Sequence, residues 1–374
     1  MKNISKYKVD TSILIMMILL AIISVVTIFS AGALIDNNTL YIKQIIWYIL
    51  GFIVAYIIMS VGNKYIYRYT WVLYGLGVLT LLSVLIFANP INDIRSWFVL
   101  PGIGTIQPSE FMKIILILTL GKVLSNFNDD KPNPDLLDEF KLLIKVAIIV
   151  LIPGILTFLQ PDTGVVLIYL LITTVMLFIS GIKYRWFGII GGLALIIVAT
   201  IVTIYFVNSQ LFIDLFGTSF FLRIDRLLDW TSKSGYQLES GISAIASGGL
   251  FGHGLGNTPI YFPAPHTDFI FAVYASNFGL VGSLLLISLI AYFDIKLINL
   301  VSKTNSIIDK LVISGIIGML LYQQIQNIGM TIGLLPITGI TLPFISYGGS
   351  SLISYMIMAG IIFNISNESL RYTN

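Results

Sequence analysis

Long apolar runs alternate with short polar segments along nearly the whole chain. A helix that crosses the hydrocarbon core of a bilayer needs about 20 predominantly apolar residues. On that scale the runs predict about ten membrane-spanning helices, over residues 11–35, 44–62, 70–88, 107–126, 140–160, 163–181, 184–207, 269–295, 308–335 and 344–366. The two-residue alternation of a barrel strand is not seen, so the pattern predicts an all-α polytopic membrane protein.

The positions of Lys and Arg predict the orientation, because cytoplasmic segments carry an excess of these residues. With the N-terminus inside, the short outside loops hold little beyond Lys43 and Arg95. The inside segments hold Lys2, Lys6, Lys8, Lys64, Arg68, Lys122, Lys131, Lys141, Lys183, Arg185, Lys296, Lys303, Lys310 and Arg371. Both termini are therefore expected in the cytoplasm. The first run is longer than the roughly 7–15 residues of a signal peptide core, so we expect it to be retained.

One segment between two spans, residues 208–268, is much longer than the others and is rich in glycine. In this topology it is a large extracytoplasmic loop. A loop of this length without evident structure of its own usually carries function. Since neither a repeat nor a low-complexity tail divides the chain, residues 1–374 are expected to form a single membrane domain.

Composition narrows the class of function. The 374 residues are 57% hydrophobic and 10% charged, whereas soluble domains carry roughly 25% charged residues. The net charge of +3 is small, so nucleic acid is not an expected partner. The absence of cysteine excludes disulfides, thiol catalysis and Cys-based zinc sites. The only histidines, His253 and His266, do not suggest a His-rich metal centre.

The motif Gln107-Pro108-Ser109-Glu110 opens one predicted span, and Lys113 follows it. Proline and an acidic residue both suit the first turn of a helix. Glu110 and Lys113 are three residues apart, so they share a helix face and can pair. Ionisable groups inside a span are costly and usually mark a functional site. The alternative is a helix start with one neutralised ion pair.

Two further carboxylates precede predicted spans. Asp162 lies in Gln160-Pro161-Asp162-Thr163-Gly164, and Asp268 lies in Pro265-His266-Thr267-Asp268. Either carboxylate suits a helix N-cap. A carboxylate beside a histidine at the outer membrane surface also suits a general base. For Asp268 both interpretations stay open. For Asp162 the alternative to a cap is a place in a site at the same outer level as Glu110.

The remaining candidates lie in loops. Arg95, close to Trp97, either binds phosphate or snorkels to the interface. The glycines at 248–256 lack the Gly-Lys-Ser/Thr ending of a nucleotide loop, so they indicate close backbone packing or a re-entrant turn. The segment from Pro343 to Ser351 opens the last span with small residues that allow close helix contact, and its hydroxyls can bind a ligand.

These modest signals share one location. Arg95, Glu110, Asp162, Asp268 and Tyr347 all fall in the outer half of the predicted topology. Packing alone does not require polar residues to align in this way. The expected substrate is therefore an anionic or sugar-bearing lipid reached from the outer leaflet. Because ATP-like donors are not expected outside the cell, any group transfer would use a lipid-activated donor.

At these residues the chain resembles the SEDS family, the shape, elongation, division and sporulation proteins of bacteria. The matching stretches are Arg95-Ser96-Trp97, residues 107–113, Gln160 to Gly164, Gly235-Tyr236-Gln237, the glycine segment, residues 266–273, Asn327 to Met330, and Leu335 through Ser351. They are spread in order over most of the chain. The ten-helix topology and the large outer loop of that family also match the count made here.

The resemblance implies a peptidoglycan glycosyltransferase in the bacterial cytoplasmic membrane, which polymerises lipid II with a class B penicillin-binding protein as its partner. It places the essential aspartate of the family at Asp268, as the base for the acceptor hydroxyl in an inverting transfer. Arg95, Lys113, Arg223 or a divalent cation (Mg or Mn) would balance the leaving pyrophosphate. The expected binding or supporting residues are Arg95, Trp97, Glu110, Lys113, Gln160, Asp162, Arg223, Tyr236, Gln237, His266, Tyr347 and Ser350.

The chain departs from the family pattern at Ser276 and Asn277, where acidic residues are usual, and before the histidine motif, where Ala264-Pro265 replaces an acid. Two other functions therefore stay open. A lipid II flippase would need ionisable residues on the inner halves of the spans, which are nearly uncharged here. A non-catalytic scaffold that activates a partner enzyme would not need Asp268. The motifs do not separate the elongation, division and sporulation branches.

Overall fold

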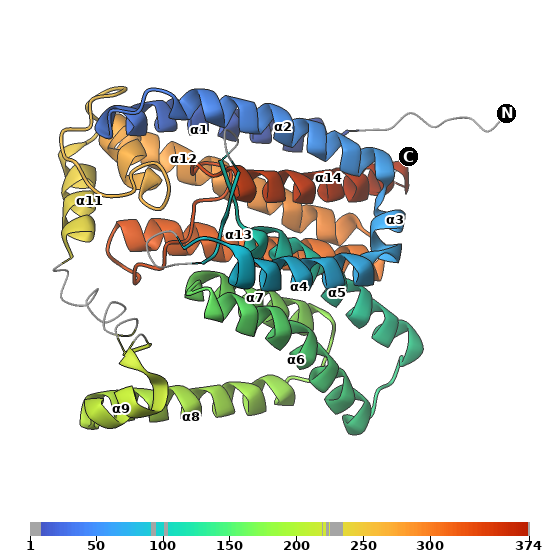
Figure 1. The fold of residues 1–374 in the computed structure, drawn as a ribbon. Coiled ribbons are helices and arrows are strands. Elements are labelled where there is room, and N and C mark those ends of the chain that lie inside the picture. Colours follow the sequence, from blue (N-terminus) through green and yellow to red (C-terminus); the bar gives the residue numbers. More distant parts are fainter. Residues whose placement is uncertain are drawn as a thin grey trace.

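The computed structural model describes residues 9–90, 95–100, 104–218, 220, 221, 224 and 235–372. Its helices are α1 (Thr11–Leu34), α2 (Leu40–Val61), α3 (Asn63–Arg68), α4 (Thr70–Phe87), α5 (Pro108–Asp130), α6 (Leu136–Leu159), α7 (Thr163–Ile179), α8 (Arg185–Val207), α9 (Ser209–Phe216), α11 (Tyr236–Ser247), α12 (Ile270–Lys303), α13 (Ile307–Thr331) and α14 (Gly349–Tyr372). A short antiparallel hairpin joins β1 (Phe98–Leu100) to β2 (Gly104–Ile106). The long helices form a bundle (Figure 1).

The predicted spans correspond to α1, α2, α4 to α8 and α12 to α14. In the described part of the chain, eight helices are long and apolar enough to cross a membrane. Of the other two predicted spans, α7 is apolar but has 17 residues. Helix α5 is long enough but carries charged residues, among them Glu110 and Lys113. The protein is a polytopic helical membrane protein, as the sequence predicted.

Helices α5, α13 and α14 form the centre of the bundle. Helix α5 contacts α4, α6, α7, α13 and α14. Glycines let α13 approach its neighbours closely, because a Cβ at Gly315 or Gly318 would lie within 3.0 Å of side chains on α7. In α5 and α13, the residues Glu110, Lys113, Gln323, Gln324 and Asn327 are buried and face protein rather than lipid.

Helix α8 lies apart from the central bundle (Figure 1). None of its residues is buried, and nearly all of them are apolar. A helix that is apolar all round and unburied is stable in lipid. Its first turn is held to α6, where Trp186 Nε1 donates to Glu139 Oε2 at 2.8 Å. The ring of Trp186 also stacks on that of Phe140, with 5.9 Å between centroids.

Helix α12 is broken at Gly279, whose φ is 64°. The glycine segment packs against this break. The carbonyl groups of Ser276 and Asn277 accept hydrogen bonds from His253 N and Gly254 N, both at 3.0 Å. A Cβ at Gly252 would lie 2.1 Å from Asn277 O, so only glycine fits there. The predicted close backbone packing of the glycine segment is confirmed.

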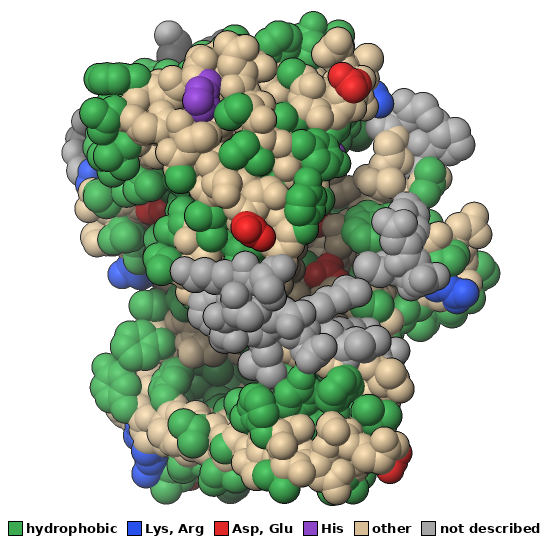
Figure 2. All heavy atoms as spheres, turned by 90° about the vertical axis from the view of Figure 1, so that its left-hand side faces the viewer, with side chains coloured by type: hydrophobic (Ala, Val, Ile, Leu, Met, Phe, Trp, Pro, Cys, Tyr) green, Lys and Arg blue, Asp and Glu red, His purple; other side chains and the backbone are tan. Residues whose placement is uncertain are grey.

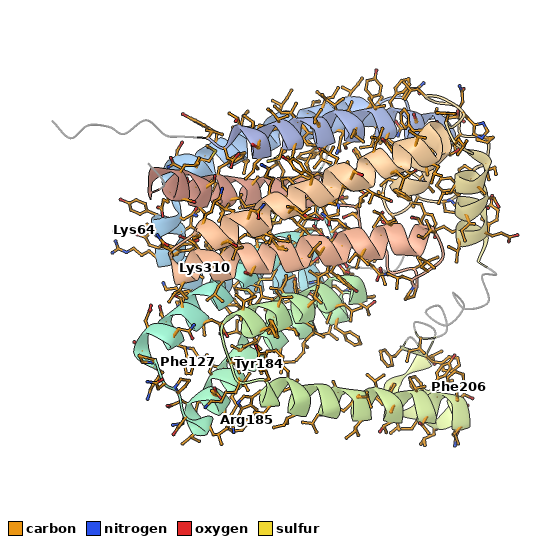
Figure 3. The ribbon with its side chains drawn as sticks, turned by 180° about the vertical axis from the view of Figure 1, so that it is seen from behind. Lys64, Phe127, Tyr184, Arg185, Phe206 and Lys310 are labelled. Atoms are coloured by element: carbon orange, nitrogen blue, oxygen red, sulfur yellow. The ribbon has the colours of Figure 1, made fainter. Side chains whose placement is uncertain are left out.

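The two ends of the bundle differ. Figure 3 places Lys64, Lys310 and Arg185 toward one end and Phe206 toward the other. Helix α11 lies across that second end, here called the α11 end (Figure 1). Figure 2 looks onto the α11 end, where Lys and Arg side chains lie mainly at the margins. The predicted loop 208–268 contributes α9 and α11 to this end, so it has helical structure of its own.

Candidate active site

A cavity of 590 Å³ lies among the residues that precede α5, α7, α12 and α14. Figure 2 shows a recess in the α11 end with an acidic side chain inside it. A volume of this size suits a small organic ligand or a sugar unit. Seven of the residues predicted for the site line the cavity: Trp97, Glu110, Asp162, His266, Asp268, Tyr347 and Ser350.

Asp268 lies just before α12 and does not cap it. The N-cap position belongs to Phe269, which makes no side-chain cap bond. Burial raises the pKa of Asp268 to about 7, the charge of Asp162 also raises it, and a hydrogen bond with Thr267 lowers it. A Cβ at Gly339 would lie 3.6 Å from Asp268 Oδ2, so the loop around Gly339 is close to the carboxylate. Near neutral pH this carboxylate can accept a proton.

Asp162 both caps a helix and lines the cavity. Its Oδ1 accepts a hydrogen bond from Val165 N at 3.2 Å and so caps α7. Its Oδ2 accepts from Gln107 Nε2 at 2.7 Å and from Ser109 Oγ at 3.4 Å. Burial raises the pKa of Asp162 to about 6, although the bond from Val165 N lowers it. The Asp162 carboxylate is therefore fixed in place and lines the cavity.

Gln107 is a site residue that the sequence did not single out. Its Oε1 accepts from Trp97 Nε1 at 3.1 Å, and its Nε2 donates to Asp162. Its backbone N donates to Ser350 Oγ at 3.0 Å, and that hydroxyl donates to Thr105 O. The side chain and the backbone of Gln107 thus connect the segment before β1, the start of α5, the start of α7 and the start of α14 around the cavity. Its place before Pro108 indicated only a helix start.

The predicted pair of Glu110 and Lys113 is confirmed, with 2.8 Å between Lys113 Nζ and Glu110 Oε2. Glu110 lines the cavity, whereas Lys113 is fully buried and lies over the ring of Tyr355. Gln323 also lines the cavity and donates to Tyr355 OH at 2.9 Å. In the sequence, Gln323 is one of four amides between residues 323 and 327, and nothing in that run indicates which of them faces a cavity, so its position was not predicted.

His266 and Tyr347 lie on the same side of the cavity, with ring centroids 5.7 Å apart. Burial lowers the pKa of His266, so the ring is neutral at pH 7. Within the described residues, His266 Nδ1 has no hydrogen-bond partner. The histidine is therefore suited to contact a ligand rather than to supply positive charge.

The other predicted residues do not line the cavity. Gln160 lies behind its wall, where its side chain donates to Leu81 O at 3.0 Å. Lys113 lies beneath it, and Arg95 is exposed outside it. Tyr236 is exposed at the start of α11. Gln237 donates to Pro263 O at 3.2 Å.

Two further predictions concern positive charge in the site: an arginine and a metal ion. Arg223 lies outside the described residues. For a metal ion, the described residues include no group of three or more His, Asp or Glu side chains that could hold it. A divalent cation in the site therefore stays a prediction from the sequence.

The chain is similar in sequence and in fold to known proteins. The chain is 35% identical over 298 residues to the probable peptidoglycan glycosyltransferase FtsW of Bacillus subtilis, covering 78% of this chain and 71% of that protein. It is 31% identical to the probable peptidoglycan glycosyltransferase FtsW of Coxiella burnetii, covering 98% of this chain and 99% of the relative. A solved structure described as a peptidoglycan synthase complex that coordinates polymerization and crosslinking contains a similar chain. The TM-score is 0.80 at 26% identity, over 97% of this chain and 99% of the other.

The family model FTSW_RODA_SPOVE, described as cell cycle protein, matches residues 7–371. The match covers almost the whole chain, including every element that lines the cavity. The chain therefore belongs to this family of cell cycle proteins, which is the SEDS family indicated by its motifs.

Proposed function

We propose that this protein is a peptidoglycan glycosyltransferase that polymerises lipid II into glycan strands by an inverting transfer. One observation carries the proposal: the carboxylate of Asp268, which does not cap α12, lines a cavity of 590 Å³ at one end of the bundle. Its pKa of about 7 suits a general base at neutral pH. The names of the relatives supply the reaction class.

In the proposed reaction, Asp268 takes the proton from the acceptor sugar hydroxyl. The hydroxyl oxygen then forms a bond to the anomeric carbon of the donor. The bond between that carbon and the pyrophosphate oxygen breaks, and undecaprenyl pyrophosphate leaves with the electron pair. A single displacement inverts the anomeric centre. Asp162, held by Gln107 and Ser109, keeps a second negative charge near Asp268, which favours proton uptake by Asp268.

The leaving pyrophosphate needs positive charge. Lys113 is buried and already paired with Glu110, so it is not available as a free cation. Arg95 is exposed outside the cavity, close in sequence to β1, and we propose it for this role. Arg223 and a divalent cation stay predictions from the sequence.

The orientation in the membrane is part of the proposal. Lys64, Lys310 and Arg185 lie toward the end opposite α11 (Figure 3). Since Lys and Arg mark cytoplasmic segments, we place that end and both termini in the cytoplasm. The cavity then opens toward the outer leaflet of the bacterial cytoplasmic membrane, where lipid-linked donors are present.

A crosslinking partner follows from the same comparison. The similar solved chain is part of a complex that coordinates polymerization and crosslinking. We propose that this chain works with a class B penicillin-binding protein, which crosslinks the strands that it makes.

The test is polymerisation of lipid II by the purified full-length protein, with and without its class B partner, with strands detected on gels. We expect glycan strands that grow with time, and more of them when the partner is present. If no strands form with the partner present, while the protein moves lipid II between leaflets of a vesicle, a flippase replaces the polymerase. Loss of both activities with retained stimulation of the partner would support a scaffold.

The pKa of Asp268 predicts the pH dependence. A base with a pKa of about 7 is protonated below that pH, so kcat/KM for lipid II, measured at low lipid II, should rise through about pH 7 and then level off. The negative charge of Asp162 raises that pKa, so Asp162→Asn should move the midpoint to lower pH. Initial rates from about pH 5 to about pH 9 measure the midpoint independently of the absolute rate. Asp138→Asn, far from the cavity, should leave the midpoint unchanged, and an unchanged midpoint in Asp162→Asn would contradict the assignment.

A further inference from the structure

Residues distant in the sequence hold the backbone of His266, Thr267 and Asp268 by hydrogen bonds. The carbonyl of His266 accepts a hydrogen bond from Tyr347 N at 2.8 Å. The carbonyl of Thr267 accepts from Ser346 Oγ at 2.7 Å. The carbonyl of Asp268 itself accepts from Asn327 Nδ2 at 2.8 Å. These bonds fix the main chain around Asp268 and leave its carboxylate open to the cavity.

The amide of Asn327 serves two loops at once. Its Nδ2 also donates to Ile340 O at 2.7 Å, and its side chain is fully buried. Ile340 belongs to the loop that passes Asp268 Oδ2 at Gly339. One buried side chain of α13 therefore connects the backbone of Asp268 to the loop that faces its carboxylate.

Residues 344–347, here called the strap, supply two of these donors and are themselves held by the first two helices. Tyr48 OH donates to Phe344 O. Ser24 Oγ donates to Ile345 O at 2.7 Å, and Gln44 Nε2 donates to Ser346 O at 3.4 Å. The side chains of α1 and α2 thus bind each carbonyl from Phe344 to Ser346.

The strap needs such restraint. Phe344 has a φ of 62°, a left-handed conformation that is strained for a bulky side chain. Ser24 and Gln44 are fully buried, and Gln44 Nε2 also donates to Ser24 Oγ at 3.1 Å. Polar side chains within membrane helices are costly unless they are satisfied. In α1 and α2 these polar groups are used to hold one strained segment next to the cavity.

We propose that Ser24, Gln44 and Tyr48 are positioning residues for Asp268, and that they act through Ser346 and Tyr347 of the strap. This inference rests on the proposed function of Asp268 as the base. Trp47 is the one residue of α1 and α2 that lines the cavity, so Ser24, Gln44 and Tyr48 do not face it. The three polar side chains influence the reaction because they fix where the Asp268 carboxylate lies.

The first test is Tyr48→Phe, which removes one hydroxyl and keeps the ring. A small displacement of a catalytic group lowers turnover more than binding, so kcat for lipid II polymerisation should fall by about 10-fold to 100-fold while KM changes little. Ser346→Ala should have the same effect, and Ser346→Thr, which keeps the hydroxyl, should restore most of kcat. A merely structural role would instead lower the amount of active protein and would not depend on the hydroxyl at residue 346.

Tyr74→Phe is the matched control. Tyr74 OH donates to a backbone carbonyl, Ile149 O, at 2.9 Å between α4 and α6, away from the strap. Its kcat should equal that of the wild type. If Tyr48→Phe and Ser346→Ala both keep the kcat of Tyr74→Phe, the positioning proposal is wrong. If Tyr48→Phe does not fold in detergent, Ser24→Ala, which removes the hydroxyl that binds Ile345 O, takes its place in the comparison.

Measuring Asp268→Asn in the same series separates the two proposals. An inactive Asp268→Asn together with normal strap variants overturns only the positioning role. An active Asp268→Asn overturns the role of the base itself.

Discussion

Replacing Asp268 with asparagine should lower the rate of lipid II polymerisation by about 10²-fold to 10⁴-fold, the usual contribution of a positioned general base. Asparagine has the same shape but cannot take the acceptor proton. The carboxylate makes no helix cap, so the fold should not depend on its charge. The measurement is the initial rate of strand formation with the partner present, on protein shown to be folded by its thermal unfolding midpoint.

A matched substitution makes this result specific. Asp214 lies in α9, is exposed and accepts a hydrogen bond from Gln210. Asp214→Asn makes the same chemical change outside the cavity and should keep the wild-type rate. A wild-type rate in Asp268→Asn would remove Asp268 from the reaction and leave Asp162 or Glu110 as the remaining carboxylates that line the cavity.

The substitution with the largest expected effect on stability is Lys113→Met. Lys113 is fully buried and pairs with Glu110, whose side chain is 10% exposed. Removing one partner leaves a buried charge without compensation, which lowers the free energy of unfolding by about 3–5 kcal/mol. Unfolding of the purified protein in detergent, followed with increasing denaturant, would measure this loss.

The double variant Glu110→Gln with Lys113→Met separates charge from packing. Replacing both members of a buried pair removes the uncompensated charge, so this variant should be more stable than Lys113→Met alone. Lys43→Met, at an exposed lysine of α2, should leave stability within experimental error. If the double variant is no more stable than the single one, the loss arises from packing and not from the charge of Glu110.

The membrane fold was largely predictable because lipid requires long apolar helices. The apolar runs gave the observed helices to within a few residues at most ends. The last helix begins at Gly349 rather than at 344, because Phe344 adopts a left-handed conformation that a helix cannot contain. The break at Gly279 was not predicted, since glycine within an apolar run occurs both in intact helices and at breaks.

The site was predictable where charge and motif coincided. Glu110, Asp162 and Asp268 line one cavity, although they lie far apart in the sequence. Gln160 shows the limit of predictions from motifs. It belongs to the same motif as Asp162, but its side-chain amide donates to Leu81 O behind the cavity wall and does not face the cavity. A polar side chain at the end of a span can turn either way, and only the packing of neighbouring helices decides which.

The contacts of Ser24 and Gln44 could not be predicted for a related reason. A lone serine or glutamine in an apolar run is compatible with many partners on any neighbouring helix. Its hydrogen bond depends on the final arrangement of helices, which no local pattern encodes.

The strap also has a consequence for biosynthesis. Ser24 and its acceptor Ile345 are 321 residues apart, and Tyr48 and Phe344 are 296 apart. Helices enter the membrane in order of synthesis. Helices α1 and α2 are therefore inserted before the strap has been translated, and their polar groups have no strap to bind until then. The cavity around Asp268 is complete only when almost the whole chain has been inserted. We therefore expect a nascent or truncated chain to lack the hydrogen bonds that hold the strap beside Asp268.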